Sequence, residues 1–120
     1  MKRVVQRRGV DCGIACVAML ANVSYEVAKK RMFGDRPVRR TSKECLQDGL
    51  RHFGIRTATR LVRCGANYTT LNFRAILKTN ATGDGNWHWI VWDADRKRIL
   101  DPLEKPYKNP RVVSYLRVYG

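Results

Sequence analysis

The chain has 120 residues, of which 44% are hydrophobic and 28% are charged, and this composition fits one compact domain over residues 1–120. Its longest apolar run, residues 14–23, falls short of the roughly 18 to 20 apolar residues that a membrane-spanning helix needs. With 24 Lys and Arg against 10 Asp and Glu, the formal charge is +14. Such a charge attracts polyanions, so nucleic acid, an anionic membrane surface and an acidic protein are all compatible partners.

The amino terminus is positively charged, like the first region of a signal peptide. Asp11 and two glycines nevertheless interrupt the approach to the apolar segment, and no clean small-residue cleavage site follows it. We therefore expect a cytoplasmic protein, or one exported without a recognisable signal peptide.

The first half of the chain shows helical periodicity. Apolar residues recur at three- and four-residue steps between Cys16 and Val23, which predicts a helix over residues 12–22. Ser24 predicts the N-cap of a second helix, which ends at Gly34. Residues 41–44, Thr-Ser-Lys-Glu, match a capping box, in which the hydroxyl and the carboxylate satisfy free amides reciprocally, and they predict a third helix that ends at Gly54.

The second half favours strands. They are predicted over residues 55–62, 71–77, 87–93, 98–101 and 112–119. In the third of these the side chains alternate, and the turn at residues 93–95 predicts a hairpin with the fourth. The two faces of that strand carry His88, Ile90 and Trp92 on one side and Trp87, Trp89 and Val91 on the other. Helices followed by an antiparallel sheet define the α+β class.

The four cysteines are expected to be free thiols, because no secretory signal is recognised and the hydrophobic content is sufficient for a core. A zinc site needs two close ligand pairs, and only Cys12 and Cys16 come near that spacing. No metal or other cofactor is therefore expected. Cys16 is in phase with the apolar face of the first helix and is predicted to lie in the core.

Three residues far apart in the sequence suggest nucleophilic chemistry. Cys12 stands where the chain enters the first helix, and the positive end of a helix dipole favours thiolate over thiol. His88 lies on a strand, and Asp101 follows thirteen residues later on the paired strand, so the hairpin would bring carboxylate and imidazole together. The residue types match nucleophile, base and orienting group. Each also has a structural interpretation: a core thiol, a polar strand residue and a turn residue before Pro102.

The blocks around these residues resemble the bacteriocin-processing double-glycine peptidases, a papain-like cysteine peptidase family. The first block is Gln6, Asp11-Cys12-Gly13 and the following Ala15-Cys16, with the family's six-residue step from Gln to Cys. Residues 88–92, His-Trp-Ile-Val-Trp, resemble its His block, and residues 99–102, Ile-Leu-Asp-Pro, resemble its terminal Asp-Pro. Three separated blocks occur in order, so the resemblance runs from Gln6 to Pro102.

The resemblance implies a papain-like fold and four site residues. Cys12 would be the nucleophile, His88 the general base and acid, Asp101 the residue that orients His88, and Gln6 a side-chain donor to the oxyanion hole. The best-known members are fused to a membrane transporter and act on leader peptides ending in Gly-Gly. No transporter segment occurs in these residues, and residues 105–119 match nothing in the family's pattern, so substrate specificity is not carried over.

Three functions from different classes are compatible with the sequence. The first is a cysteine peptidase that cleaves a peptide or protein substrate, or a related transferase in which an amine replaces water. The second is a papain-like domain used for binding or regulation. The third is a basic nucleic-acid-binding domain in which Cys12, His88 and Asp101 meet by coincidence. Because the basic residues are scattered and no zinc finger, phosphate loop or RNA-binding signature accompanies them, the third rests on electrostatics alone.

Overall fold

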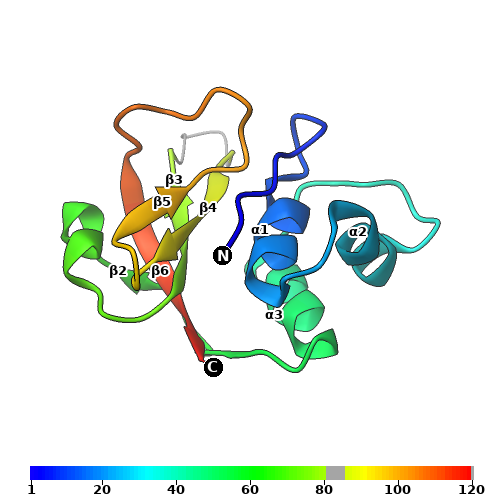
Figure 1. Cartoon of the computed structure of the whole chain (residues 1–120), viewed down its shortest axis with the longest axis horizontal. Helices are drawn as coiled ribbons and strands as arrows, with labels where there is room; N and C mark the ends of the chain where they lie inside the picture. The colour runs from blue at the N-terminus through cyan, green and yellow to red at the C-terminus, as the bar shows by residue number, and fades with distance from the viewer. Residues whose placement is uncertain (81–85, 120) are drawn as a thin grey trace.

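The computed structural model describes residues 1–80 and 86–119 and contains three helices beside an antiparallel sheet (Figure 1). This confirms the predicted α+β class. The helices are α1 (Cys12–Ala21), α2 (Tyr25–Phe33) and α3 (Lys43–His52), with a 3-10 helix η1 (Gly65–Thr70) between strands. The strands are β1 (Arg56–Thr57), β2 (Val62–Arg63), β3 (Ala75–Thr79), β4 (His88–Asp93), β5 (Arg98–Leu100) and β6 (Val112–Tyr119).

Helix α1 is the central helix of the molecule. It packs against α2, α3 and β4, and every residue from Cys12 to Leu20 is buried. The sequence predicted one apolar face, but neighbours on several sides leave α1 no solvent-facing face. The helix ends at Asn22, which adopts the left-handed conformation with φ 56°. Among the described residues, no single helix is long and apolar enough to cross a membrane.

The caps of α2 and α3 were predicted with different success. Ser24 caps α2, as predicted, because its hydroxyl accepts the N–H of Val27 at 3.2 Å. The N-cap of α3 is Ser42, whose hydroxyl accepts the N–H of Cys45. The predicted capping box led by Thr41 is therefore wrong by one residue. Thr41 is instead buried against α1, where a Cβ on Gly13 would lie 1.9 Å from its Oγ1.

The strand order in the sheet is β1-β6-β3-β4-β5, with β2 also pairing with β6. Strand β6, predicted over the same residues, lies between β3 on one side and β1 and β2 on the other. The face of the sheet toward the helices buries Ile76, Trp89, Val91 and Leu116. The opposite face buries a second cluster that includes Leu77, Ile90 and Trp92. The alternation predicted for β4 is therefore confirmed.

Two predicted strands differ from the structure. The segment 55–62 is not one strand, because only β1 and β2 pair with β6 and the chain leaves the ladder between them. The segment 71–77 becomes a strand only at Ala75 and extends to Thr79, several residues after η1 has ended at Thr70. Strand propensity could not predict these boundaries, because they depend on which residues pair with the distant strand β6.

The β4–β5 hairpin is present as predicted. Val91 lies opposite Leu100, and the turn that follows β4 includes Lys97 in the left-handed conformation. This register returns residue 101 to the neighbourhood of the first residues of β4. Since α1 begins against that same end of β4, the hairpin also sets the position of His88 relative to Cys12.

Candidate active site

Cys12 is the first residue of α1 and lies against the sheet. Its side chain is buried, with the residue only 2% exposed, and its Sγ accepts the backbone N–H of Trp89 at 3.5 Å. Asp11 precedes it as the N-cap, and the Asp11 carbonyl accepts the N–H groups of Ile14 and Ala15. The sulfur therefore occupies the amide-rich end of a helix that packs directly on β4.

His88 and Asp101 form a close pair. The imidazole Nε2 lies 2.7 Å from Oδ1 of Asp101, and the Asp101 side chain is 3% exposed. The same Oδ1 accepts the N–H of Leu103 at 2.9 Å, which fixes the carboxylate within its own loop. The predicted meeting of imidazole and carboxylate across the hairpin is thus found, and the pair determines which ring nitrogen remains available.

Cys12 also acts on His88, because its side chain is one of the groups that raise the pKa of the ring. Because Asp101 occupies Nε2, the nitrogen left for the sulfur is Nδ1. Burial lowers the pKa of His88, but hydrogen bonds with Asp101 and Cys12 and the charges of both groups outweigh it and raise the pKa from 6.5 to about 9. Near neutral pH the ring is therefore an imidazolium between a carboxylate and the sulfur.

Gln6 is held near the same loop, and its side chain contacts the backbone of Arg8. Its backbone N–H donates to the Pro102 carbonyl at 2.8 Å, which places it beside the Asp101 loop. One side-chain N–H donates to the Arg8 carbonyl at 2.5 Å. Its Oε1 has no hydrogen-bond partner among residues 1–80 and 86–119. The second N–H of the amide is the group that an oxyanion could use.

Asp11 has a structural role that we did not assign from the sequence. Its fully buried carboxylate accepts the backbone N–H groups of Arg7 and Arg8, each at 2.9 Å, and the hydroxyl of Tyr25 at 2.6 Å. Burial and the hydrogen bond with Asp11 raise the pKa of Tyr25 to about 12. Asp11 thus fixes the turn that connects Gln6 to Cys12. The position of an acidic residue directly before the candidate nucleophile was the available signal.

Access to the sulfur is restricted. The ring of Tyr107, from the loop after β5, packs edge-on against His88 with centroids 5.9 Å apart. Two large cavities, of about 820 and 660 Å³, lie elsewhere: one beside Met1 and Arg117, the other beside Tyr68 and Pro110. A smaller cavity of about 470 Å³ is lined by Trp87 and Trp89 and lies next to the candidate site. Cys12 and His88 do not line this cavity.

The remaining cysteines have other surroundings. All four cysteines are free, and Cys16 is fully buried in the core as predicted. Burial, with contributions from Cys12 and Asp101, raises the pKa of Cys16 well above its usual range, and burial also raises that of Cys64. Within the described part of the chain, no cluster of three or more His, Cys, Asp or Glu side chains could hold a metal ion.

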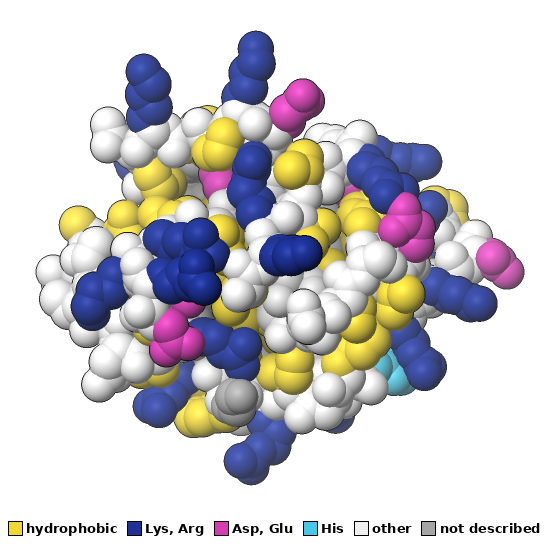
Figure 2. Space-filling model, in the orientation of Figure 1, with side chains coloured by type: hydrophobic (Ala, Val, Ile, Leu, Met, Phe, Trp, Pro, Cys, Tyr) yellow, Lys and Arg dark blue, Asp and Glu magenta, His cyan; other side chains and the backbone are white. Residues whose placement is uncertain are grey.

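The positive charge is distributed. Figure 2 shows Lys and Arg side chains over the whole visible face rather than in one patch.

Comparisons with known proteins add no identification, because no family model, curated protein or solved structure matches this chain. The interpretation of the site therefore depends on the geometry of its own residues.

Proposed function

We propose that this protein is a papain-like cysteine peptidase that cleaves a peptide or protein substrate. The observation that carries the proposal is the arrangement around His88. Asp101 lies 2.7 Å from one ring nitrogen, and Cys12, which begins a buried helix, has its Sγ 3.5 Å from the backbone nitrogen of the next residue, Trp89. Order along the chain and residue types agree with the double-glycine peptidase resemblance, which also suggests the papain-like fold.

In the first half-reaction the Cys12 thiolate attacks the carbonyl carbon of the scissile peptide bond. The carbonyl oxygen becomes an oxyanion, for which the Cys12 backbone N–H and the Gln6 amide are the proposed donors. The His88 imidazolium then gives its proton to the leaving amine as the C–N bond breaks. A thioester on Cys12 and a neutral His88 remain.

In the second half-reaction water attacks the thioester. Neutral His88 accepts a proton from the water, the C–S bond breaks, and the carboxylic acid product leaves. The recovered proton restores the imidazolium–thiolate pair. Asp101 keeps the ring oriented through Nε2 and stabilises its positive charge in both steps.

Selective alkylation tests the proposal without knowledge of the substrate. With limiting iodoacetamide near neutral pH, Cys12 should be labelled well ahead of Cys16, Cys45 and Cys64, as followed by intact mass and peptide mapping. His88→Ala should slow labelling of Cys12 by about tenfold or more, because the imidazolium no longer stabilises the thiolate. Cys45→Ala is the matched control and should leave it unchanged. Equal labelling of all four cysteines would contradict the proposal.

The restricted access favours one alternative, a papain-like domain that binds without cleaving. Cys12 is 2% exposed and Tyr107 packs on His88. If access is the obstacle, wild-type Cys12 should resist alkylation while Tyr107→Ala makes it reactive. If Cys12 is already the fastest thiol in the wild type, the binding-only alternative loses its support.

A further inference from the structure

A cavity of about 470 Å³ opens where the start of α3 meets the sheet. Its walls come from both parts of the molecule, with the first residues of α3 on one side and β3, β4 and the segment before β2 on the other. We call it the Trp89 groove. The residues that matter here are Ser42, Lys43, Arg60, Lys78, Trp87 and Trp89.

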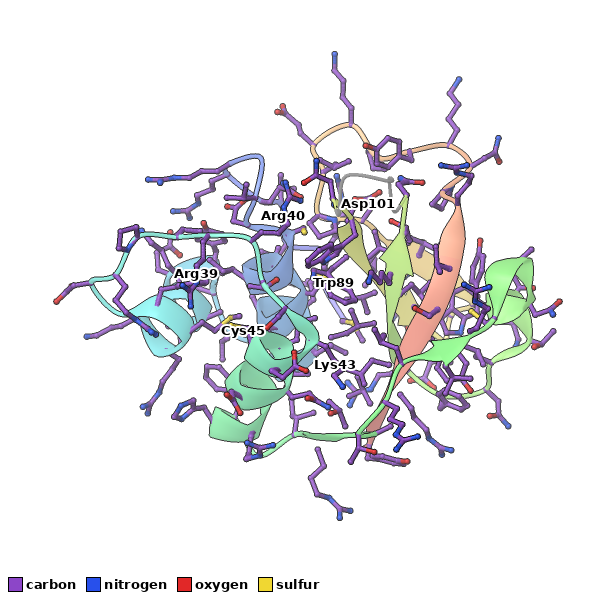
Figure 3. All side chains as sticks on the ribbon, turned by 180° about the vertical axis from the view of Figure 1, so that it is seen from behind. Arg39, Arg40, Lys43, Cys45, Trp89 and Asp101 are labelled. Atoms are coloured by element: carbon purple, nitrogen blue, oxygen red, sulfur yellow. The ribbon has the colours of Figure 1, made fainter. Side chains whose placement is uncertain are left out.

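Trp89 connects the Trp89 groove to the candidate active site, because it lines the groove and also contacts Cys12. The indole N–H of Trp89 donates to the Thr41 carbonyl at 2.9 Å, and its backbone N–H lies 3.5 Å from Cys12 Sγ. Trp87 directly precedes His88 in the chain. Figure 3 shows Arg40, Trp89 and Lys43 along the junction between helices and sheet, with Asp101 at the same end of the sheet as Arg40. A substrate with its scissile carbonyl at Cys12 can therefore place a neighbouring side chain in this groove.

Positive charge dominates the groove. Three cations and one carboxylate, Glu44, line it. Glu44 lies 3.7 Å from Lys43 and offsets that charge in part. Arg60 and Lys78 make no ion pair within residues 1–80 and 86–119, and Lys78 Nζ lies 4.9 Å from the centre of the Trp87 ring. The groove thus presents uncompensated cations against an aromatic wall.

We propose that the Trp89 groove binds an acidic side chain of the substrate, next to the bond that Cys12 cleaves. This rests on the peptidase function proposed above and extends it to substrate class. A carboxylate in the groove would accept charge-assisted hydrogen bonds from Lys78 and Arg60. Arg40 adds to the field, since its Nη1 donates to the Trp87 carbonyl at 3.0 Å.

The geometry favours a peptide over a nucleic acid. Single-stranded nucleic acids bind where bases stack on free aromatic faces. The Trp87 ring already has Lys78 at 4.9 Å and Arg40 at 6.0 Å over it. The volume of the groove suits a side chain, and the other Lys and Arg residues are spread over the surface rather than aligned in one track (Figure 2).

Binding can be tested apart from catalysis in Cys12→Ala. The probes are fluorescein-labelled octapeptides of Ala and Gly that carry two adjacent Glu residues, the same peptides with Gln instead, and octathymidylate. The Glu peptides should bind about tenfold or more tightly than the Gln peptides at low salt, measured by fluorescence anisotropy.

Matched variants assign the effect to the groove. Arg60→Gln with Lys78→Met, added to Cys12→Ala, should remove the preference for Glu over Gln. Arg63→Gln with Lys30→Met makes the same change in net charge outside the groove and should keep the preference. Circular dichroism and thermal unfolding establish that both proteins are folded. Equal loss in both pairs would overturn the proposal, as would tighter groove-dependent binding of octathymidylate than of the Glu peptides.

A covalent readout connects the groove to the sulfur in the wild type. Peptidyl acyloxymethyl ketones with Glu should inactivate Cys12 faster than their Gln counterparts, and the groove variants should abolish that difference. If Cys12 is selectively alkylated by iodoacetamide but the Glu preference is missing, the groove proposal fails alone. If the Glu preference in binding holds but Cys12 shows no selective reactivity, the peptidase function fails while the acidic groove remains.

Discussion

His88 is the residue at which the geometry and the proposed chemistry can be compared most directly. Asp101 holds one ring nitrogen, and Asp101 and Cys12 together raise the pKa of the partly buried imidazole to about 9 against the effect of burial. The proton that His88 must give to the leaving amine is therefore already present at neutral pH. In the proposed mechanism, the leaving amine then needs no other proton donor.

The pH dependence of turnover follows from this protonation. Because the pKa of His88 in the folded protein is about 9, the imidazolium persists through neutral pH and is lost as the pH rises through about 9. The rate of the first half-reaction should fall over that range, since the leaving amine loses its proton donor. Asp101→Asn should move this descending limb to lower pH, because the neutral amide no longer stabilises the imidazolium. The pH profile of kcat/KM measures both, and a limb unchanged in Asp101→Asn would contradict the assignment.

The same pairing is linked to folding. A His whose pKa rises on folding stabilises the native state fully below its unfolded pKa, about 6.5, and this contribution disappears as the pH rises through about 9. The rate of the proposed first half-reaction and the contribution of His88 to the free energy of unfolding should therefore decline over the same alkaline pH range.

Sequence reasoning at the residue level predicted the contact between His88 and Asp101 that the structure contains. Cys12, His88 and Asp101 could be selected because few residue types act as nucleophile, base or orienting group. The predicted hairpin also placed His88 and Asp101 on neighbouring strands. Asp11 could not be assigned, because its partner Tyr25 lies in the next helix and the amides it binds belong to a turn without periodicity. The actual bond of the Gln6 side chain to Arg8 was likewise invisible in the spacing.

At the level of elements, the start of α1 depends on a close approach to the segment before α3. Gly13 follows Cys12, and a Cβ placed on it would lie 1.9 Å from Thr41 Oγ1 and 2.8 Å from Thr41 Cβ. Thr41 in turn offers its carbonyl to Trp89, the residue whose backbone N–H contacts the sulfur. Gly13 therefore permits the packing that places Cys12 against β4.

Gly13→Ala should lower the free energy of unfolding by about 1 to 3 kcal/mol, because the steric conflict exceeds the gain in helix propensity. Thr41→Ala in the same chain removes Oγ1 and Cγ2 and should recover part of the loss, since only the Thr41 Cβ contact at 2.8 Å remains. Gly9→Ala is the control, because a Cβ added at Gly9 would meet no atom within 4 Å. Urea unfolding measures all four proteins. If Gly13→Ala has the same free energy of unfolding as the wild type, the prediction is wrong, and Thr41 can move away from α1 without loss of stability.

Elements with local signals were predictable, and elements defined by distant partners were not. Ser24 and Gly34 set both ends of α2, and strand alternation gave β4 and its hairpin. The division of residues 55–62 into β1 and β2 and the appearance of η1 depend on pairing with β6, more than 50 residues later. The shift from Thr41 to Ser42 as N-cap likewise reflects a tertiary contact, because Thr41 is drawn into the core against Gly13.

At the scale of the whole molecule, the charge of +14 and the reactivity of the sulfur act over different distances. The cations are spread over the surface, while Cys12, His88 and Asp101 are largely enclosed between α1, β4 and the loop after β5. Exposed charges are screened beyond a Debye length of about 10 Å at 0.1 M salt. The pair around His88 acts over direct hydrogen-bond contacts and lies where ions enter poorly.

A single salt titration separates these two contributions. From about 0.05 to 0.5 M NaCl, binding of the Glu-bearing peptides to Cys12→Ala should weaken steeply, because the surface field and the exposed Arg60 are screened. Alkylation of wild-type Cys12 by uncharged iodoacetamide should change far less, because the contacts with His88 and the helix terminus are short. Peptides with Gln serve as the control and should show little salt dependence. A parallel loss of Cys12 reactivity and peptide binding would mean that the surface charge itself sustains the thiolate, and the enclosed His88–Asp101 pair would then not be its main determinant.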